Sequence, residues 1–202
     1  SAHQDCIFRD CLILSNNSYP QRTQALAPVN VGSLVTVAKQ HSMALWSLKM
    51  NCVNANQLRV VAFGIGGAGC NVLSQLPTNA RGAAVELVAV NTDANALSKL
   101  SSIQTLQLGS SGEPAGEPER GRIAAKATQE AVELSLAGVE QLSLFAGMGG
   151  GTGTGASVEI ARIACRQGIS VRAFVTTPFA FEGGRWMQRA LLIRRELFMR
   201  PH

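Results

Sequence analysis

A run of glycines and threonines in the second half of the chain has the composition of a phosphate-binding turn. It extends from Ala146 to Gly155 and reads Ala-Gly-Met-Gly-Gly-Gly-Thr-Gly-Thr-Gly. An apolar segment, 142–146, leads into it, and a helical pattern, 156–167, follows it. Glycines let the backbone approach an anion closely, and a helix start adds the positive end of its dipole. This stretch therefore predicts a phosphate site between a buried strand and a helix.

The glycine run contains no lysine, so it is not a Walker A loop, which requires Gly-x-x-x-x-Gly-Lys-Ser/Thr. A phosphate bound here must be neutralised by backbone amides, a helix dipole and a cation. The threonine hydroxyls can donate to phosphate or help to hold a metal. A flexible linker is not expected at a junction with ordered apolar flanks on both sides.

A second glycine segment follows another strand pattern, Leu58 to Phe63. It reads Gly-Ile-Gly-Gly-Ala-Gly-Cys-Asn from Gly64 to Asn71, and a helical pattern continues to about Leu76. Its spacing, Gly64-x-Gly66-x-x-Gly69, is also found in dinucleotide-binding Rossmann domains. Taken alone, this segment does not show whether the site binds a mononucleotide or NAD.

Taken together, the two glycine segments resemble those of the tubulin/FtsZ family of GTPases. The residues from Gly149 to Gly155 match the Gly-Gly-Gly-Thr-Gly-Thr-Gly signature of that family. The segment ending in Asn71 resembles its first nucleotide loop, with Ala68 in place of one glycine. Asn91-Thr92-Asp93 and the segment 178–185 are also similar. The resemblance covers roughly residues 58–190.

The resemblance implies a site for GTP or GDP with Mg²⁺, in which both glycine segments hold phosphates. It places Asp93 near the Mg²⁺, Glu182 on the ribose and Thr154 nearest the reacting phosphate, as the catalytic residue. From the residues alone, Asp93 could instead bind a ribose hydroxyl in a dinucleotide fold or simply cap the helix that starts at Ala94. The resemblance assigns the nucleotide site to Gly66, Gly67, Ala68, Gly69, Cys70, Asn71, Asp93, Gly149, Gly150, Gly151, Thr152, Gly153, Thr154, Gly155, Glu182 and Arg185.

Two segments depart from the family pattern. The loop 109–121, which matches the loop over the γ-phosphate in position, lacks the usual basic residue and carries Glu113, Glu117 and Glu119. Three carboxylates beside a triphosphate are repulsive unless they face solvent. Near the end of the chain, Trp186 occupies the position of the family's nucleotide-contacting arginine, and Arg185 lies one residue earlier.

Composition excludes several classes of function. The chain has 202 residues and a net charge of +5, but its basic excess lies at the two ends: 58–184 contains nine basic and ten acidic residues. A nucleic-acid-binding body is therefore not expected. The five cysteines are scattered without zinc-binding spacing, and no metal site of protein ligands is predicted. No apolar run reaches the roughly 18 residues that direct membrane insertion requires.

Two regions are expected. Residues 1–57 read as a poorly structured arm or a transit-like leader, and 58–202 as an incomplete GTP-binding domain. Strand and helix patterns alternate over five candidate strands, 58–63, 85–90, 103–108, 142–146 and 171–176, which predicts an α/β fold. The expected architecture is a Rossmann-like, mostly parallel sheet covered by helices. The location is then cytoplasmic, or the plastid stroma if 1–57 is a transit segment.

Three functions remain open at this point. The first is an FtsZ-like division protein that associates head to tail with itself or with FtsZ-type filament subunits. In that family a second domain carries an acidic loop that completes hydrolysis on the neighbouring subunit. Because the resemblance stops before that domain, the chain reads as C-terminally truncated and is expected to bind GTP but scarcely to hydrolyse it. The alternatives are an NAD-type Rossmann domain and a truncated, non-hydrolysing regulator of FtsZ filaments.

Overall fold

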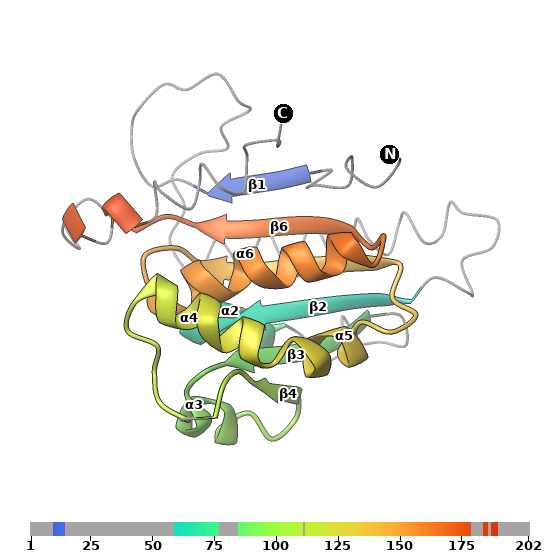
Figure 1. Cartoon of the computed structure of the whole chain (residues 1–202), viewed down its shortest axis with the longest axis horizontal. Coiled ribbons are helices and arrows are strands. Elements are labelled where there is room, and N and C mark those ends of the chain that lie inside the picture. The colour runs from blue at the N-terminus through green and yellow to red at the C-terminus, as the bar shows by residue number, and fades with distance from the viewer. Residues whose placement is uncertain are drawn as a thin grey trace.

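Six parallel strands form the sheet on which the described part of the chain is built (Figure 1). This computed structural model describes residues 10–14, 59–76, 85–110, 112–178, 184–185 and 187–189. The strands are β1 (Asp10–Leu14), β2 (Val60–Ile65), β3 (Val85–Asn91), β4 (Gln104–Gln107), β5 (Gln141–Gly147) and β6 (Ser170–Thr176). The helices are α2 (Gly66–Gln75), α3 (Ala94–Ser98), α4 (Pro118–Ala127), α5 (Gln129–Ser135) and α6 (Gly151–Arg166).

The strand order, β1-β6-β5-β2-β3-β4, creates a switch point between β2 and β5. From β2 the chain passes through α2 to β3 on one side, whereas from β5 it passes through α6 to β6 on the other side. The two helices consequently lie on opposite faces of the sheet. Figure 1 shows α4 and α6 in front of the sheet and α2 behind it. In open parallel sheets, ligands bind at the carboxyl edge beside such a switch point.

Alternate side chains of each central strand are buried in two separate hydrophobic cores. On the α6 side, Phe63, Leu144 and Ile160 belong to one buried cluster. On the α2 side, the rings of Phe145 and Phe174 stack with centroids 4.9 Å apart in the second cluster. Burial of both faces explains why these strands read as nearly continuous apolar runs.

The predicted fold class is confirmed, since all five expected strands form and every strand pair is parallel. The strand β1, which pairs with β6, is an addition that the sequence did not predict. The boundary proposed at residue 57 stays a prediction, because 15–58 lies outside the described residues. None of the helices in the described part of the chain is long and apolar enough to cross a bilayer.

Both glycine segments differ from expectation in one respect. They were expected to be loops that precede helices, but α2 already begins at Gly66 and α6 at Gly151. Two further helices, α4 and α5, meet at Thr128. The Thr128 hydroxyl donates to the carbonyl oxygen of Ala124 at 2.7 Å, a side-chain bond to the backbone that often bends helices.

An ion pair joins β2 and β3 at the end of the sheet that lies away from the switch-point edge. Arg59 donates from Nε and Nη2 to the two carboxylate oxygens of Glu86, each at 2.7 Å, and from Nη1 to the carbonyl oxygen of Ala137. These hydrogen bonds hold the pKa of Glu86 below its ordinary value. Both side chains are partly exposed, so solvent screens the pair.

We expect Glu86→Gln to lower the free energy of unfolding by at most about 1 kcal/mol at pH 7. A carboxyl whose pKa is depressed by folding stabilises the fold above its unfolded pKa, about 4.3, and this stabilisation is lost as the pH falls through the folded value. The difference between variant and parent should therefore vanish in acid. Urea denaturation at pH 7 and pH 3 measures it, with the exposed Glu140→Gln as control. An equal loss in both variants would contradict the assignment.

Candidate functional site

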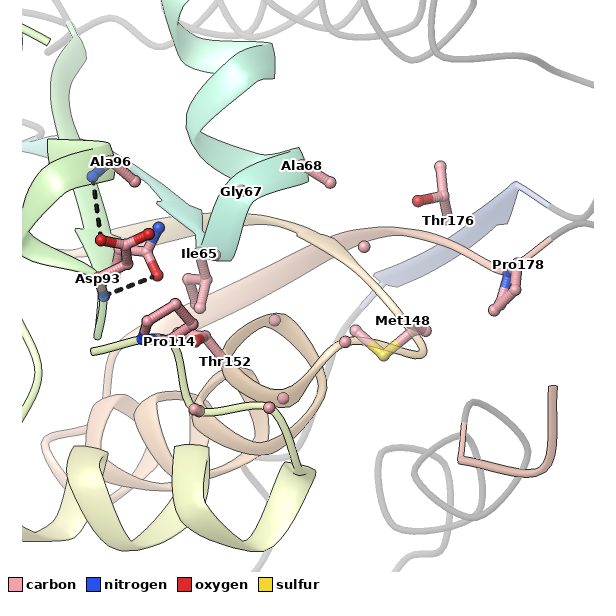
Figure 2. Close-up of a pocket in the computed structure, with 18 of the residues that line it drawn as sticks. Ile65, Gly67, Ala68, Asp93, Ala96, Pro114, Met148, Thr152, Thr176 and Pro178 are labelled. Atoms are coloured by element: carbon pink, nitrogen blue, oxygen red, sulfur yellow. Dashed lines mark hydrogen bonds between the residues drawn. The ribbon is translucent and has the colours of Figure 1, made fainter. Parts of the chain in front are cut away.

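A pocket of about 510 Å³ opens at the carboxyl edge of the sheet, across the switch point (Figure 2). The ends of four strands contribute to it, and its volume lies within the range of small-molecule sites. Figure 2 shows Gly67 and Ala68 on one side of the pocket and Thr152 and Pro114 on the other. The lining residues are Ile65, Gly66, Gly67, Ala68, Asn91, Asp93, Ala96, Pro114, Ala115, Gly116, Gly147, Met148, Gly150, Gly151, Thr152, Gly153, Thr176, Thr177 and Pro178.

The two glycine segments, distant in sequence, touch each other in this pocket. Gly66 has a φ of 70°, and a Cβ atom placed on it would lie 2.8 Å from the backbone nitrogen of Gly153. The same atom would lie 3.5 Å from Cβ of Thr152. A positive φ favours glycine, and the close contact excludes a side chain as well. The first turns of α2 and α6 therefore meet backbone to backbone.

Neither helix start is capped by a side chain. The residues before them, Ile65 and Gly150, form no side-chain cap hydrogen bond, and neither first turn contains an acidic residue. The first amides of a helix have no partner within the helix, and the macrodipole places positive charge there. Two such starts converging on one pocket fit an anion of the size and charge of a nucleotide's phosphates.

The pocket offers little else to neutralise an anion. Asp93 is the single ionisable residue among the lining residues, and none of the described residues that line the pocket is basic. Its carboxylate oxygen Oδ1 accepts from the amides of Asn95 at 2.9 Å and Ala96 at 3.2 Å. Asp93 thus caps α3, one of the roles open from the sequence, and also lines the pocket.

Several glycines are required where backbone segments pack closely, whether or not they also line the pocket. A Cβ atom on Gly155 would overlap the carbonyl oxygen of Pro118 at the start of α4. One on Gly121 would overlap the carbonyl oxygen of Gly151, and one on Gly153 would overlap that of Gly147. Glycines therefore let α4 lie directly against α6, which fixes the direction of the α6 start.

The structure separates the two threonines of the signature. Thr152 lines the pocket, whereas Thr154 is 0% exposed and does not line it. The Thr154 hydroxyl accepts from the amide of Gly149 at 2.7 Å, which holds the turn at Gly149, where φ is 111°. The structure thus gives Thr154 a bond that shapes the turn; the catalytic role assigned to it by resemblance stays a prediction.

A hydrogen-bonded node that the sequence did not single out connects three walls of the pocket. The Thr92 and Thr152 hydroxyls lie 2.8 Å apart, and the amide of Ala115 donates to the Thr92 hydroxyl at 3.0 Å. Thr92 is buried and directly follows β3. It joins the start of α6 to the loop 112–117. The sequence offered two signals for Thr92: the resemblance of Asn91-Thr92-Asp93 to the family pattern, and a polar residue at a strand end beside Asp93.

The remaining assigned residues of the first segment lie behind the pocket wall. Gly69 and Cys70 are buried within α2, and Asn71 is exposed; none of the three lines the pocket. The Cys70 thiol donates to the carbonyl oxygen of Gly64 at 3.3 Å, and burial raises its pKa to about 11. Ala68 is part of the helix, so it takes no strained positive φ.

The loop 109–121, which carries three glutamates, is compatible with an anion in the pocket. Of the described residues of this loop, Pro114, Ala115 and Gly116 line the pocket. The side chains of Glu117 and Glu119 are 69% and 65% exposed and pair with Arg189 and Arg122, respectively, while Glu113 is also exposed. The condition stated from the sequence, that these carboxylates face solvent, is met.

Two residues noted near the end of the chain, Glu182 and Trp186, lie outside the described residues. Arg185 is described as helical and exposed, and it does not line the pocket. The nucleotide contacts assigned to Glu182 and Arg185 stay predictions.

Comparisons with known proteins agree on one family. A family model described as Tubulin/FtsZ family, GTPase domain, matches residues 59–199. The cell division protein FtsZ of Neisseria meningitidis is 43% identical over 131 residues, which cover 62% of this chain and 33% of that protein. The chain thus spans about a third of the length of the curated relatives it matches.

Solved structures give the same result. An empty FtsZ dimer from M. jannaschii superposes with a TM-score of 0.64 at 28% identity, covering 78% of this chain and 46% of that one. CetZ2 from Haloferax volcanii, solved as a GTPγS-bound protofilament, gives a TM-score of 0.60 at 26% identity, covering 69% and 46%.

The contact between the two glycine segments predicts unequal effects at neighbouring positions. Gly66→Ala combines a positive φ with a clash against Gly153, so we expect it to lower the free energy of unfolding by about 2 kcal/mol or more. Gly67→Ala, where an added Cβ meets nothing within 4 Å, should leave stability unchanged or slightly raised. Thermal unfolding followed by circular dichroism compares the two. Equal stability of both variants would show that the helix starts do not touch.

Proposed function

The chain belongs to the Tubulin/FtsZ family, GTPase domain, and from this premise we propose that its pocket binds GTP and GDP as part of an FtsZ-type cell division protein. The observation that carries the proposal is the convergence of two uncapped helix starts, at Gly66 and Gly151, on one pocket. Backbone amides and two dipoles supply the positive potential that a lysine supplies in other phosphate sites. CetZ2, which was solved with GTPγS, has the same fold at 26% identity.

Within this proposal, a divalent cation completes the neutralisation. Mg²⁺ usually keeps several waters and binds through phosphate oxygens and one or two carboxylates. Asp93, the one carboxylate among the described residues that line the pocket, uses Oδ1 as a helix cap. Its Oδ2 would hold a water of the hydrated ion. No cluster of three acidic, His or Cys side chains that could hold a metal ion occurs among the described residues.

Self-association belongs to the same proposal. The relatives include an FtsZ dimer and a CetZ2 protofilament. We infer that this chain offers the nucleotide-bearing side of a head-to-tail contact, either to copies of itself or to FtsZ-type subunits. A cytoplasmic location goes with this function. The plastid location gains no support from the relatives named above, which are bacterial or archaeal.

The alternatives fare differently. An NAD-type Rossmann domain would use the first glycine segment and Asp93, and would leave the wall formed by Gly150–Gly153 without a ligand. A non-hydrolysing regulator of FtsZ filaments would use the same pocket. Both this regulator and the division protein would bind GTP, so a binding measurement does not distinguish them. Their effects on GTP hydrolysis and on FtsZ filaments do.

Binding can be tested by isothermal titration of the chain with GTP and Mg²⁺, with NAD as the competing ligand. We expect saturable binding of GTP and none of NAD. In Gly67→Asp, a carboxylate at the start of α2 should weaken GTP binding at least about tenfold by repulsion, while leaving the helix as stable or more stable. The matched variant Gly67→Asn lacks the charge and should bind nearly as the parent does. Tighter binding of NAD than GTP would overturn the proposal.

Hydrolysis by the isolated chain should be scarce, because the resemblance assigns part of the catalytic machinery to a second domain of the neighbouring subunit. We expect less than one phosphate released per chain in an hour with saturating GTP and Mg²⁺, measured by phosphate release. Addition of a complete FtsZ would distinguish co-assembly, with raised turnover, from regulation, with shortened filaments. Steady multiple turnover by the chain alone would contradict this division of labour.

A further inference from the structure

The loop that closes one side of the pocket contains a tight turn centred on Gly116. Its φ is 69°, and the amide of Glu117 donates to the carbonyl oxygen of Ala115 at 2.7 Å. This i to i+2 bond with a positive φ is the rare and strained form of the γ-turn, which glycine tolerates best. Such a turn is expected to need support from its surroundings.

Support comes from both sides of the turn. On the pocket side, the amide of Ala115 donates to the Thr92 hydroxyl at 3.0 Å. On the other side, Arg189 donates from Nη1 to the carbonyl oxygen of Gly116 at 3.2 Å and from Nη2 to the Glu117 carboxylate at 3.3 Å. Arg189 is more than seventy positions away in sequence, and its side chain is only 25% exposed.

The turn lies directly against the start of α6. A Cβ atom on Gly151 would lie 2.8 Å from the backbone nitrogens of Gly116 and Glu117. Phosphates held at that helix start therefore have the turn as their neighbour. Among the described residues, Arg189 does not line the pocket. Through its hydrogen bond, Arg189 restrains the carbonyl oxygen of Gly116 from turning toward an anion inside the pocket. Its charge also offsets that of Glu117 at the rim.

We propose that Arg189 is a positioning residue which holds the Ala115–Glu117 turn in place and so favours a nucleoside triphosphate over a diphosphate. The inference rests on the proposed nucleotide function of the pocket. A triphosphate carries more negative charge than a diphosphate and extends further from the helix starts. It is therefore more sensitive to a carbonyl dipole turned inward and to an uncompensated Glu117 carboxylate. Arg189 acts through Gly116 and Glu117 and does not touch the ligand.

The test compares GTP and GDP affinities, measured by titration, in Arg189→Gln and in Arg120→Gln. Arg120 is an exposed arginine of α4, so its variant loses the same charge. We expect Arg189→Gln to lower the ratio of GTP to GDP affinity by about threefold to tenfold. Arg120→Gln should stay within about twofold of the parent. Adding Glu117→Gln to Arg189→Gln removes the uncompensated carboxylate and should restore part of the ratio. An unchanged ratio in Arg189→Gln would overturn the inference while leaving GTP binding intact.

A second measurement does not depend on nucleotide. Hydrogen exchange of the amides of Ala115 and Glu117 should be faster in Arg189→Gln than in the parent and in Arg120→Gln. If the parent chain binds no GTP, the proposed function fails, and exchange still decides whether Arg189 holds the turn. If Arg189→Gln does not fold, Arg189→Lys keeps the charge with one donor group and should give an intermediate ratio and intermediate exchange. Parent-like exchange in the variant would contradict the positioning role.

Discussion

Two helices begin in backbone contact with each other, and the rest of the site depends on that contact. A Cβ atom on Gly66 would lie 2.8 Å from the backbone nitrogen of Gly153, so a side chain at Gly66 has no room beside the start of α6. Bringing two helix starts together concentrates unpaired amides and two positive dipole ends, an arrangement that is unfavourable without an anion. Side chains do not relieve it, because neither start is capped. The arrangement is best understood as a site prepared for an anionic ligand.

The sheet makes this contact possible. Because β2 and β5 are neighbours whose following helices cross to opposite faces, α2 and α6 start at the same edge and diverge from it. Glycines then set the distances: α4 packs against α6 at Gly121 and Gly155, and Ala68 packs where Gly147 has no side chain. The signature thus combines two requirements, room for a ligand and room for a neighbouring helix. A glycine motif in such a fold therefore does not require that every glycine meets the ligand.

Much of the fold could be predicted from the sequence, because its strands are short apolar runs followed by glycine or polar residues. The sequence predicts loops at the two helix starts, because glycine has a low helix propensity. In the structure, packing overrides that propensity and places Gly151 to Gly155 in α6. Residue types and their spacing were sufficient to assign both glycine segments and Asp93 to the candidate site. The Thr92 node and the Arg189 contact join segments far apart in sequence, which no local pattern encodes. The two signature threonines look the same in the sequence. The structure distinguishes them, because the Thr152 hydroxyl bonds to Thr92 and the Thr154 hydroxyl accepts from the amide of Gly149.

The central claim is that one ligand occupies both helix starts at once. Amide chemical shifts of the ¹⁵N-labelled chain, followed during titration with GDP and Mg²⁺, test it most directly. The amides of Gly66 and Gly67 and those of Gly151 to Gly153 should shift together and reach half-saturation at one common nucleotide concentration. Shifts confined to one of the two sets, or two sets with different midpoints, would contradict a shared site.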